Sequence, residues 1–250
     1  MFIDTHCHLD SYNDLEKIIK KMENNIIIAS GINTITNKQV IELCNKYNNV
    51  YGTIGYHPEE IYDWNEDSLT FLEKNLSNPK IVGIGEIGLD YYWNKENKEK
   101  QKEIFLKQLD LAEKYNKTVV IHSRDSIEDT YNILKEKKNL KINIHCFSSS
   151  YEMAEKFIKL GAKIGVGGVV TFKNGVKLKE VVEKVDLEHI VLETDSPYLT
   201  PEPFRGKENE PYNVYYVAQK IAEIKNVSID EVFKITTNNA IMQFDLNVEI

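Results

Sequence analysis

The chain has 250 residues, of which 42% are hydrophobic and 28% are charged, a composition typical of a globular protein large enough to bury a substantial core. Its formal net charge of −8 opposes general attraction to nucleic acid or anionic membranes, so an anionic substrate needs a local basic pocket. Three widely spaced cysteines, an N-terminus without the apolar run of a signal peptide and the lack of any apolar run of about 18 residues predict a cytoplasmic protein that does not span a membrane.

Short apolar runs recur along the whole chain, and each is typical of a buried strand. Polar or amphipathic stretches separate them. The runs cover residues 2–6, 26–32, 50–57, 81–89, 118–124, 142–147, 163–170 and 190–195.

Helical patterns occupy the stretches between these runs. Apolar residues within 15–22 follow the spacing of one helix face, and a second such stripe runs over 104–115. The sequence "SIDE" at 228–231 is a capping box that predicts the start of a last helix. No linker or change of composition divides the chain, so we expect one domain over residues 1–250.

Eight alternations of strand and helix predict a parallel sheet covered by helices. A closed (β/α)8 barrel and an open doubly wound sheet both fit this pattern. A barrel of this type usually has about 250 residues. No G-x-G-x-x-G follows the first strand, which weakens the nucleotide-binding open sheet. We therefore predict a single (β/α)8 TIM-type barrel.

Polar residues gather at or near the C-terminal ends of the predicted strands. In a barrel all these ends meet at one face, where active sites are built. One such histidine alone is more typical of a structural role, but a converging set predicts a metal site at that face. The set is His6, His8, His57, Glu86, His122, His145 and Asp195.

The first strand carries the sequence "FIDTHCHLD". Because side chains alternate along a strand, His6 and His8 point into the barrel and Cys7 points outward. Two imidazoles can then reach one ion from one face. Further polar side chains are expected one layer deeper, where they either orient the ligands or form a hydrogen-bonded structural network. These are Asp4, Asn143 and Glu193.

The motifs around these residues resemble the TatD family of metal-dependent deoxyribonucleases, which are amidohydrolase-like barrels. The resemblance extends over essentially the whole chain, and the motifs occur in the family's order. They are "FIDTHCHLD", "GYHPEE", "GEIGLDYY", "VVIHSRD", "HCF", "ETDSPYL", "RGKENEP" and "TTNNA".

The resemblance implies a hydrolase of phosphodiester bonds, typically a 3′-to-5′ exonuclease or a nuclease acting on single-stranded DNA. It implies six ligands for two divalent ions: His6, His8 and Asp195 for the first, His122 and His145 for the second, and Glu86 as a bridge between them. The family often has a second histidine after "HP", whereas this chain has Glu59.

The resemblance also implies that His57, Arg205 and Lys207 contact the substrate. The loop over 201–211 follows the last predicted strand, so it lies on the active-site rim. There Arg205 offers a planar fork for phosphate, and Lys207 adds a point charge.

Two further groups each have two possible roles. Arg124 either helps to bind phosphate or pairs with Asp125. The aromatic run over 91–93 either stacks on bases or packs at the edge of the barrel.

The chemistry follows from the donor groups. A pair of divalent ions can lower the pKa of bound water from about 15.7 to about 7 and can clamp the attacking and leaving oxygens. Glu86 can bridge the ions, and Asp195 can bind metal and orient or deprotonate the attacking water. Four imidazoles favour zinc, manganese or nickel, whereas the family is described as magnesium-dependent. We therefore expect two divalent ions, with Mg, Mn and Zn as candidates.

We expect DNA as the substrate, either single-stranded or at 3′ ends, and no membrane or obligate protein partner. Two other functions remain open. One is metal-dependent hydrolysis of another ester or amide, including aminoacyl-tRNA deacylation. The other is metal binding without catalysis, and the complete ligand set argues against it.

Overall fold

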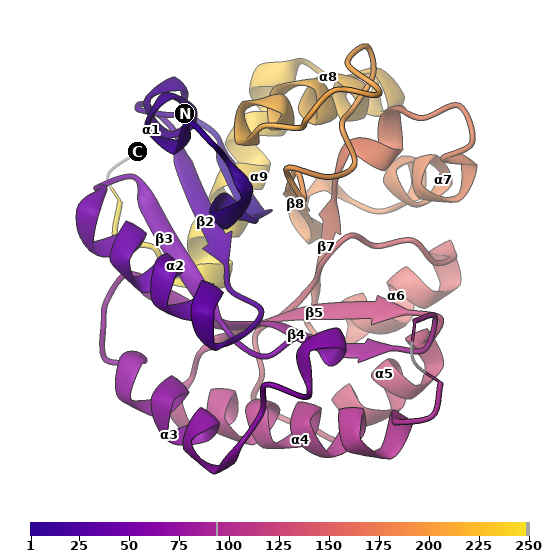
Figure 1. Cartoon of the computed structure of the whole chain (residues 1–250). Helices are drawn as coiled ribbons and strands as arrows, with labels where there is room; N and C mark the ends of the chain where they lie inside the picture. Colours follow the sequence, from indigo (N-terminus) through magenta and orange to yellow (C-terminus); the bar gives the residue numbers. More distant parts are fainter. Residues whose placement is uncertain (94, 249–250) are drawn as a thin grey trace.

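The computed structural model describes residues 1–93 and 95–248. In this part of the chain, eight parallel strands lie in chain order around one sheet, with helices outside them (Figure 1). The strands are β1 (Ile3–Cys7), β2 (Ile26–Ser30), β3 (Val50–Ile54), β4 (Ile81–Asp90), β5 (Thr118–Arg124), β6 (Ile142–Ile144), β7 (Lys163–Val166) and β8 (Ile190–Leu192). The predicted (β/α)8 barrel is confirmed.

The last strand meets the first through a few backbone contacts. Cys7 forms an isolated parallel bridge with Ser196. The His8 N–H donates to the Ser196 carbonyl oxygen at 2.7 Å, and the Asp195 N–H donates to the His6 carbonyl oxygen at 3.0 Å. The barrel therefore closes beside three of the predicted metal ligands.

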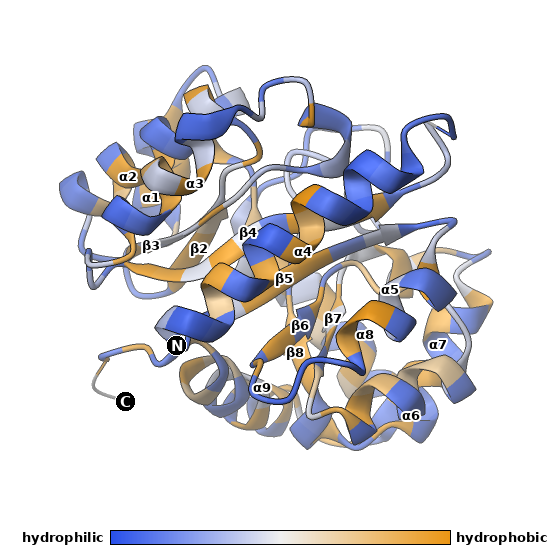
Figure 2. Ribbon diagram, turned by 90° about the horizontal axis from the view of Figure 1, so that it is seen from below, coloured by the Kyte–Doolittle hydropathy of each residue, from blue (hydrophilic) through white to orange (hydrophobic). Residues whose placement is uncertain are grey.

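Helices cover the strands on the outside. They are α1 (Leu15–Lys21), α2 (Thr34–Lys46), α3 (Glu66–Asn75), α4 (Lys98–Tyr115), α5 (Ile127–Leu134), α6 (Tyr151–Lys159), α7 (Val176–Lys184), α8 (Val214–Lys225) and α9 (Ile229–Phe244). Figure 2 shows mostly hydrophobic strands inside helices that carry both hydrophobic and hydrophilic sides. The helices predicted from 15–22, 104–115 and 228–231 are present, and Ser228 accepts the Glu231 N–H as the cap of α9. None of the described helices is both long and apolar enough to cross a membrane.

Helix α9 covers the N-terminal end of the barrel. Its side chains Ala240 and Phe244 join a buried apolar cluster with Ile3 and Ile26, which begin β1 and β2. Asn239 also donates hydrogen bonds to the Ile190 carbonyl oxygen at the start of β8. This end is therefore filled, and the opposite end is left for a site.

Two buried glutamines of α4 hold the backbone after β3 and at the end of β4. Gln108 accepts from the Tyr56 N–H at 2.8 Å and donates to the Tyr56 carbonyl at 3.1 Å. Gln101 bonds both backbone groups of Asp90 at 2.9 Å. The two glutamines are seven residues apart, so they lie on one face of the helix. Through them α4 fixes the backbone next to His57 and at the end of β4.

Replacing Gln108 by Leu should lower the free energy of unfolding by about 1–3 kcal/mol, because two buried backbone groups of Tyr56 lose their partners. Urea unfolding followed by circular dichroism measures the change. The matched control is Lys107→Ala on the exposed side of α4, which should shift stability by less than about 0.5 kcal/mol. Equal stabilities for the two variants would contradict this role of Gln108.

Candidate metal centre

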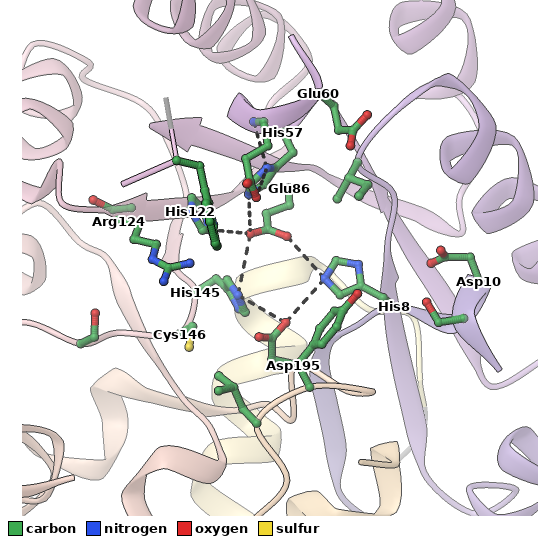
Figure 3. Close-up of a pocket in the computed structure, with 18 residues that line it drawn as sticks. His8, Asp10, His57, Glu60, Glu86, His122, Arg124, His145, Cys146 and Asp195 are labelled. Atoms are coloured by element: carbon green, nitrogen blue, oxygen red, sulfur yellow. Dashed lines mark hydrogen bonds and ion pairs between the residues drawn. The ribbon is translucent and has the colours of Figure 1, made fainter. Parts of the chain in front are cut away.

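Six side chains predicted as metal ligands converge at the C-terminal end of the barrel (Figure 3). We call them the six-residue centre. They are His6 in β1, His8 just after it, Glu86 in β4, His122 in β5, His145 after β6 and Asp195 after β8.

Glu86 lies in the middle of this set, and its side chain is 4% exposed. Its Oε1 is 2.9 Å from His122 Nδ1 and 3.5 Å from His57 Nε2. Its Oε2 is 3.4 Å from His6 Nε2 and 3.5 Å from His8 Nε2. The two oxygens of one carboxylate therefore face two different pairs of histidines.

Asp195 closes the set on the side of His6, His8 and His145. Its Oδ1 lies 3.7 Å from His6 Nε2, 3.5 Å from His8 Nε2 and 3.7 Å from His145 Nε2. The His6 and His145 rings are stacked with their centroids 3.6 Å apart. His145 Nε2 is also 3.8 Å from Glu86 Oε1, so this histidine lies between the two carboxylates.

Gly88 allows β4 and β5 to approach each other at this centre. It pairs with His122 in the sheet and has a φ of 147°, in the region that favours glycine. A Cβ there would lie 2.0 Å from the His122 carbonyl oxygen. The glycine in "GEIGLD" thus brings Glu86 and His122 together.

The ring nitrogens of His6 and His8 that point away from the centre both meet Ser30. His6 Nδ1 is 3.0 Å from the Ser30 hydroxyl, and His8 Nδ1 is 3.3 Å from the Ser30 carbonyl oxygen. A carbonyl oxygen only accepts, so His8 carries its proton on Nδ1 and leaves an Nε2 lone pair facing the centre. The Ser30 hydroxyl can accept from His6 in the same way.

Carboxylates occupy the same position beside the other two histidines of the centre. His122 Nε2 lies 3.0 Å from Asp90 Oδ2, so its Nδ1 faces Glu86. His145 Nδ1 lies 3.1 Å from Glu193 Oε1, at an angle outside hydrogen-bond geometry, and its Nε2 faces Asp195. Such outer partners fix the orientation of metal-binding imidazoles.

The charges in the centre suit cations. Burial raises the pKa of Glu86, but the surrounding histidines outweigh it and hold the pKa well below its usual range. Burial lowers the pKa of His145, but the charges of Glu193 and Glu86 outweigh it and raise it to about 10. Burial likewise opposes the hydrogen bonds of His122 to Asp90 and Glu86, which raise its pKa to about 9. Glu86 and Asp195, whose pKa is also lowered, are thus held ionised among imidazoles.

The donor set therefore fits divalent metal ions. Groups of three donor atoms within 4.8 Å of one another occur in the described residues: His6, His8 and Glu86; His6, His145 and Asp195; and His57, Glu86 and His122. Imidazole nitrogens with carboxylate oxygens suit zinc and manganese, and the carboxylates also suit magnesium.

Cys146 forms a further group of donors with His145 and Glu193. Burial and the negative charges of Asp195 and Glu193 raise the pKa of its thiol well above the usual range. Metals bind the thiolate rather than the thiol, so Cys146 is a poor candidate ligand here.

A cavity of about 620 Å³ lies over the centre. In Figure 3, Asp10 and Glu60 lie on one side of it and Arg124 on the other, and Glu59 and Trp93 also line it. Among the described residues that line this cavity, Arg124 is the only lysine or arginine.

Arg124 is held at the cavity by aromatic rings. Its guanidinium carbon lies 4.0 Å from the Tyr92 ring centroid and 5.4 Å from that of Trp93. Tyr92 and Trp93 are exposed, whereas Tyr91 is buried and donates to Asp129 Oδ2. No described ion pair joins Arg124 to Asp125. Of the two expected roles, the structure therefore favours a cation at the cavity over pairing with Asp125.

The expected contact of Arg205 and Lys207 with substrate stays a prediction, and the structure shows only where their side chains lie. Neither residue lines the cavity. The Arg205 guanidinium lies 3.9 Å from the Phe172 ring centroid and donates to the Thr200 carbonyl oxygen at 3.1 Å. Lys207 Nζ lies 5.6 Å from the Phe204 ring centroid. Both cations of the loop therefore pack on aromatic rings outside the lining of the cavity. His57 does line the cavity, as expected.

Sequence reasoning missed two residues that orient ligands, Asp90 and Ser30. The sequence could have identified Asp90, because it lies four residues after Glu86 on the same predicted strand and so shares its face. Ser30 is the polar end of an apolar run, a weak signal. Of the deeper polar residues, Glu193 contacts His145, whereas Asp4 bonds Thr194 and the His6 backbone. The side chain of Asn143 has no hydrogen-bond partner among the described residues.

Known proteins resemble this chain over nearly its whole length. The family model described as TatD related DNase matches residues 3–245. The metal-dependent hydrolase YabD of Bacillus subtilis strain 168 is 41% identical over 99% of this chain and 100% of that protein. The metal-dependent hydrolase YcfH of Escherichia coli K12 is 33% identical over 98% of this chain and 96% of that protein.

Solved structures with the same fold also superpose on nearly the whole chain. The TatD homologue YJJV from Escherichia coli K12 superposes with a TM-score of 0.93 at 31% identity and covers 98% of both chains. A TatD family hydrolase from Entamoeba histolytica superposes with a TM-score of 0.84 at 26% identity and covers 97% of both chains.

Metal binding should release protons at neutral pH. The pKa values of His122 and His145 lie above the ordinary value of about 6.5, so both rings are protonated at pH 7 when no cation is bound. A ligand ring must lose that proton, so the affinity for Zn²⁺ or Mn²⁺ should fall as pH is lowered. Calorimetry in buffers of different ionisation enthalpy should show roughly two protons released per chain.

The same shifts set the stability of the metal-free protein. Because the pKa values of His122 and His145 are raised in the folded state, their protonation adds to the free energy of unfolding. This contribution is fully present below a pH of about 6.5 and is lost as the pH rises through about 9 to 10. The surface variant His189→Gln serves as the control and should leave both measurements unchanged. Metal binding at pH 7 without proton release would contradict this prediction.

Proposed function

The chain belongs to the TatD family of metal-dependent hydrolases, and we propose that it hydrolyses phosphodiester bonds of DNA with two divalent ions. The position of Glu86 carries the proposal. Its Oε2 faces His6 and His8, and its Oε1 faces His122 and His145, as a ligand shared by two ions requires. Divalent ions held there would activate water and neutralise the charge of a phosphate.

Asp195 is the proposed acceptor of the proton from the attacking water. Its side chain is 16% exposed, against 4% for Glu86, so it is the carboxylate of the centre that best reaches the cavity. Burial raises its pKa, but the neighbouring His8 and His145 outweigh it and lower the pKa below its usual value. The group is therefore ionised at neutral pH and can accept a proton.

Arg124 is the proposed contact for a backbone phosphate. Its guanidinium rests on the Tyr92 ring, and the edges of its planar fork remain for phosphate oxygens. The carboxylates of Asp10, Glu59 and Glu60 repel a polyanion, so DNA should enter along the side of Arg124 and Trp93. There the exposed Trp93 offers a stacking surface for a base.

The shape of the barrel favours a strand end over a continuous duplex. The N-terminal end is filled by α9, so substrate enters and leaves through one mouth. A cavity of about 620 Å³ is in the range of small-ligand sites. This supports exonuclease action on single-stranded DNA or 3′ ends, as the resemblance implied.

The function is tested with end-labelled single-stranded DNA, abasic DNA and acylated tRNA, each with Mg²⁺, Mn²⁺ or Zn²⁺. We expect nucleotides to be released from DNA. Glu86→Gln should lower kcat at least about 100-fold while the circular dichroism spectrum stays unchanged. Deacylation of tRNA without cleavage of DNA would instead place this chain among ester hydrolases.

The role of Arg124 is tested by comparing Arg124→Ala with Arg205→Ala. Arg124→Ala should raise KM for single-stranded DNA and make the slope of log K against log salt shallower by about 0.7, the contribution of one phosphate contact. A small activated phosphodiester, which reaches only the centre, should be affected much less.

Arg205→Ala is the matched control, since the Arg205 guanidinium packs on Phe172. It should change neither KM nor the salt slope. The opposite result, with the DNA effect in Arg205→Ala alone, would return the phosphate contact to the loop over 201–211.

A further inference from the structure

His57 differs from the histidines of the six-residue centre in what meets its far nitrogen. The other four rings meet an oxygen atom there, from Ser30, Asp90 or Glu193. His57 Nδ1 instead accepts a hydrogen bond from the backbone N–H of Glu59 at 3.2 Å. This difference determines which of its nitrogens carries the proton.

The local sequence fixes this bond. His57 is the cap of the short 3₁₀ helix η2 (Pro58–Glu60), whose first residue is proline. Proline has no N–H, so the Glu59 N–H is the first free donor at the start of the helix and needs an acceptor. The His57 ring supplies it. The sequence "HPE" therefore holds the ring through one nitrogen.

A neutral imidazole has one donor nitrogen and one acceptor nitrogen. Since Nδ1 accepts, Nε2 carries the proton. Glu86 Oε1 lies 3.5 Å from Nε2, which favours a proton there. The competing carboxylate oxygen of Glu59 is 3.8 Å from Nδ1, too far to accept a hydrogen bond from it. A doubly protonated ring would set its Nδ1–H against the Glu59 N–H.

The tautomer separates His57 from the metal ligands. A ligand must present a lone pair, and His57 presents an N–H. This N–H is buried at the floor of the cavity beside the centre, with its ring 4.3 Å from that of His122. In Figure 3, His57 and Asp195 lie on opposite sides of Glu86.

We infer that His57 is not a metal ligand but a neutral hydrogen-bond donor that stabilises the charge developing on the leaving oxygen of the substrate. In an in-line displacement the leaving oxygen departs opposite the attacking water, and Asp195 is the proposed acceptor on the attacking side. The donor on the other side of Glu86 then faces the departing oxygen. The identity of that oxygen, an alkoxide of DNA, rests on the proposed function, whereas the proton position does not.

The first test reads the tautomer directly. Long-range ¹H–¹⁵N spectra of histidine-labelled protein, with and without Zn²⁺, should show one ring with protonated Nε2 and bare Nδ1 that keeps this state when metal is added. The signal is assigned by its loss in His57→Asn. A His57 signal with protonated Nδ1 in the zinc-loaded protein would make it a ligand and overturn the inference.

The second test counts metal. Asparagine at position 57 can still accept the Glu59 N–H as a helix cap, but its shorter side chain removes the donor from the cavity. His57→Asn should bind as many Zn²⁺ ions as the wild type in native mass spectrometry, whereas the control His122→Asn should bind fewer. Loss of an ion in His57→Asn would overturn the inference. Neither this test nor the spectra depend on activity toward DNA.

The third test varies the leaving group. His57→Asn should lower kcat on single-stranded DNA by about 10²–10³-fold, as expected for loss of one donor to a developing oxyanion. An aryl phosphodiester with a good leaving group needs less stabilisation and should lose much less. His57→Gln, which keeps a side-chain N–H donor, should recover part of the rate. Equal losses on both substrates would show that the donor does not act on the leaving oxygen.

Discussion

The structure depends on the burial of one carboxylate, Glu86, among imidazoles. An isolated ionised carboxylate cannot be buried at acceptable cost without compensating charge. Its ion-pair partners among the described residues are all histidines, brought by β1, β5 and the loops after β3 and β6. Barrel closure beside His6 and Asp195, the glycine that lets β4 approach β5 and the glutamines of α4 all fix this arrangement. Cations or protons must balance the charge, so the fold creates a site suited to cations at this position.

Five histidines lie around Glu86, and their outer partners divide them by function. An oxygen atom behind a ring leaves a lone pair facing the centre, and an N–H behind a ring leaves a donor. The first case applies to the four rings beside Ser30, Asp90 and Glu193, and the second to His57 alone. One residue type can thus offer a lone pair at one position and an N–H at the next, with no difference in its own chemistry.

The cavity is electrically uneven, which matters for a protein of net charge −8. Asp10, Glu59 and Glu60 add carboxylates to those of Glu86 and Asp195, whereas Arg124 is its one arginine among the described lining residues. Stacking on Tyr92 keeps the guanidinium in place without an ion pair that would neutralise it. A chain of phosphates is therefore attracted along one approach and repelled from the other, so a single arginine can orient a polyanion on an acidic protein.

The amino-acid sequence is enough to predict the eight strands, the single barrel and the convergence of the six candidate ligands. Those features follow from short-range patterns: apolar runs of strand length, helical spacing, and polar residues at strand ends that a barrel must bring to one face. It also placed His57 in the cavity. The directions of the arginine side chains depend on tertiary contacts, because Arg124 packs on the ring of Tyr92 and Arg205 on the ring of Phe172. Likewise, the outer partners of His6, His8 and His122 come from other strands, and no local pattern states which side chains meet across a barrel.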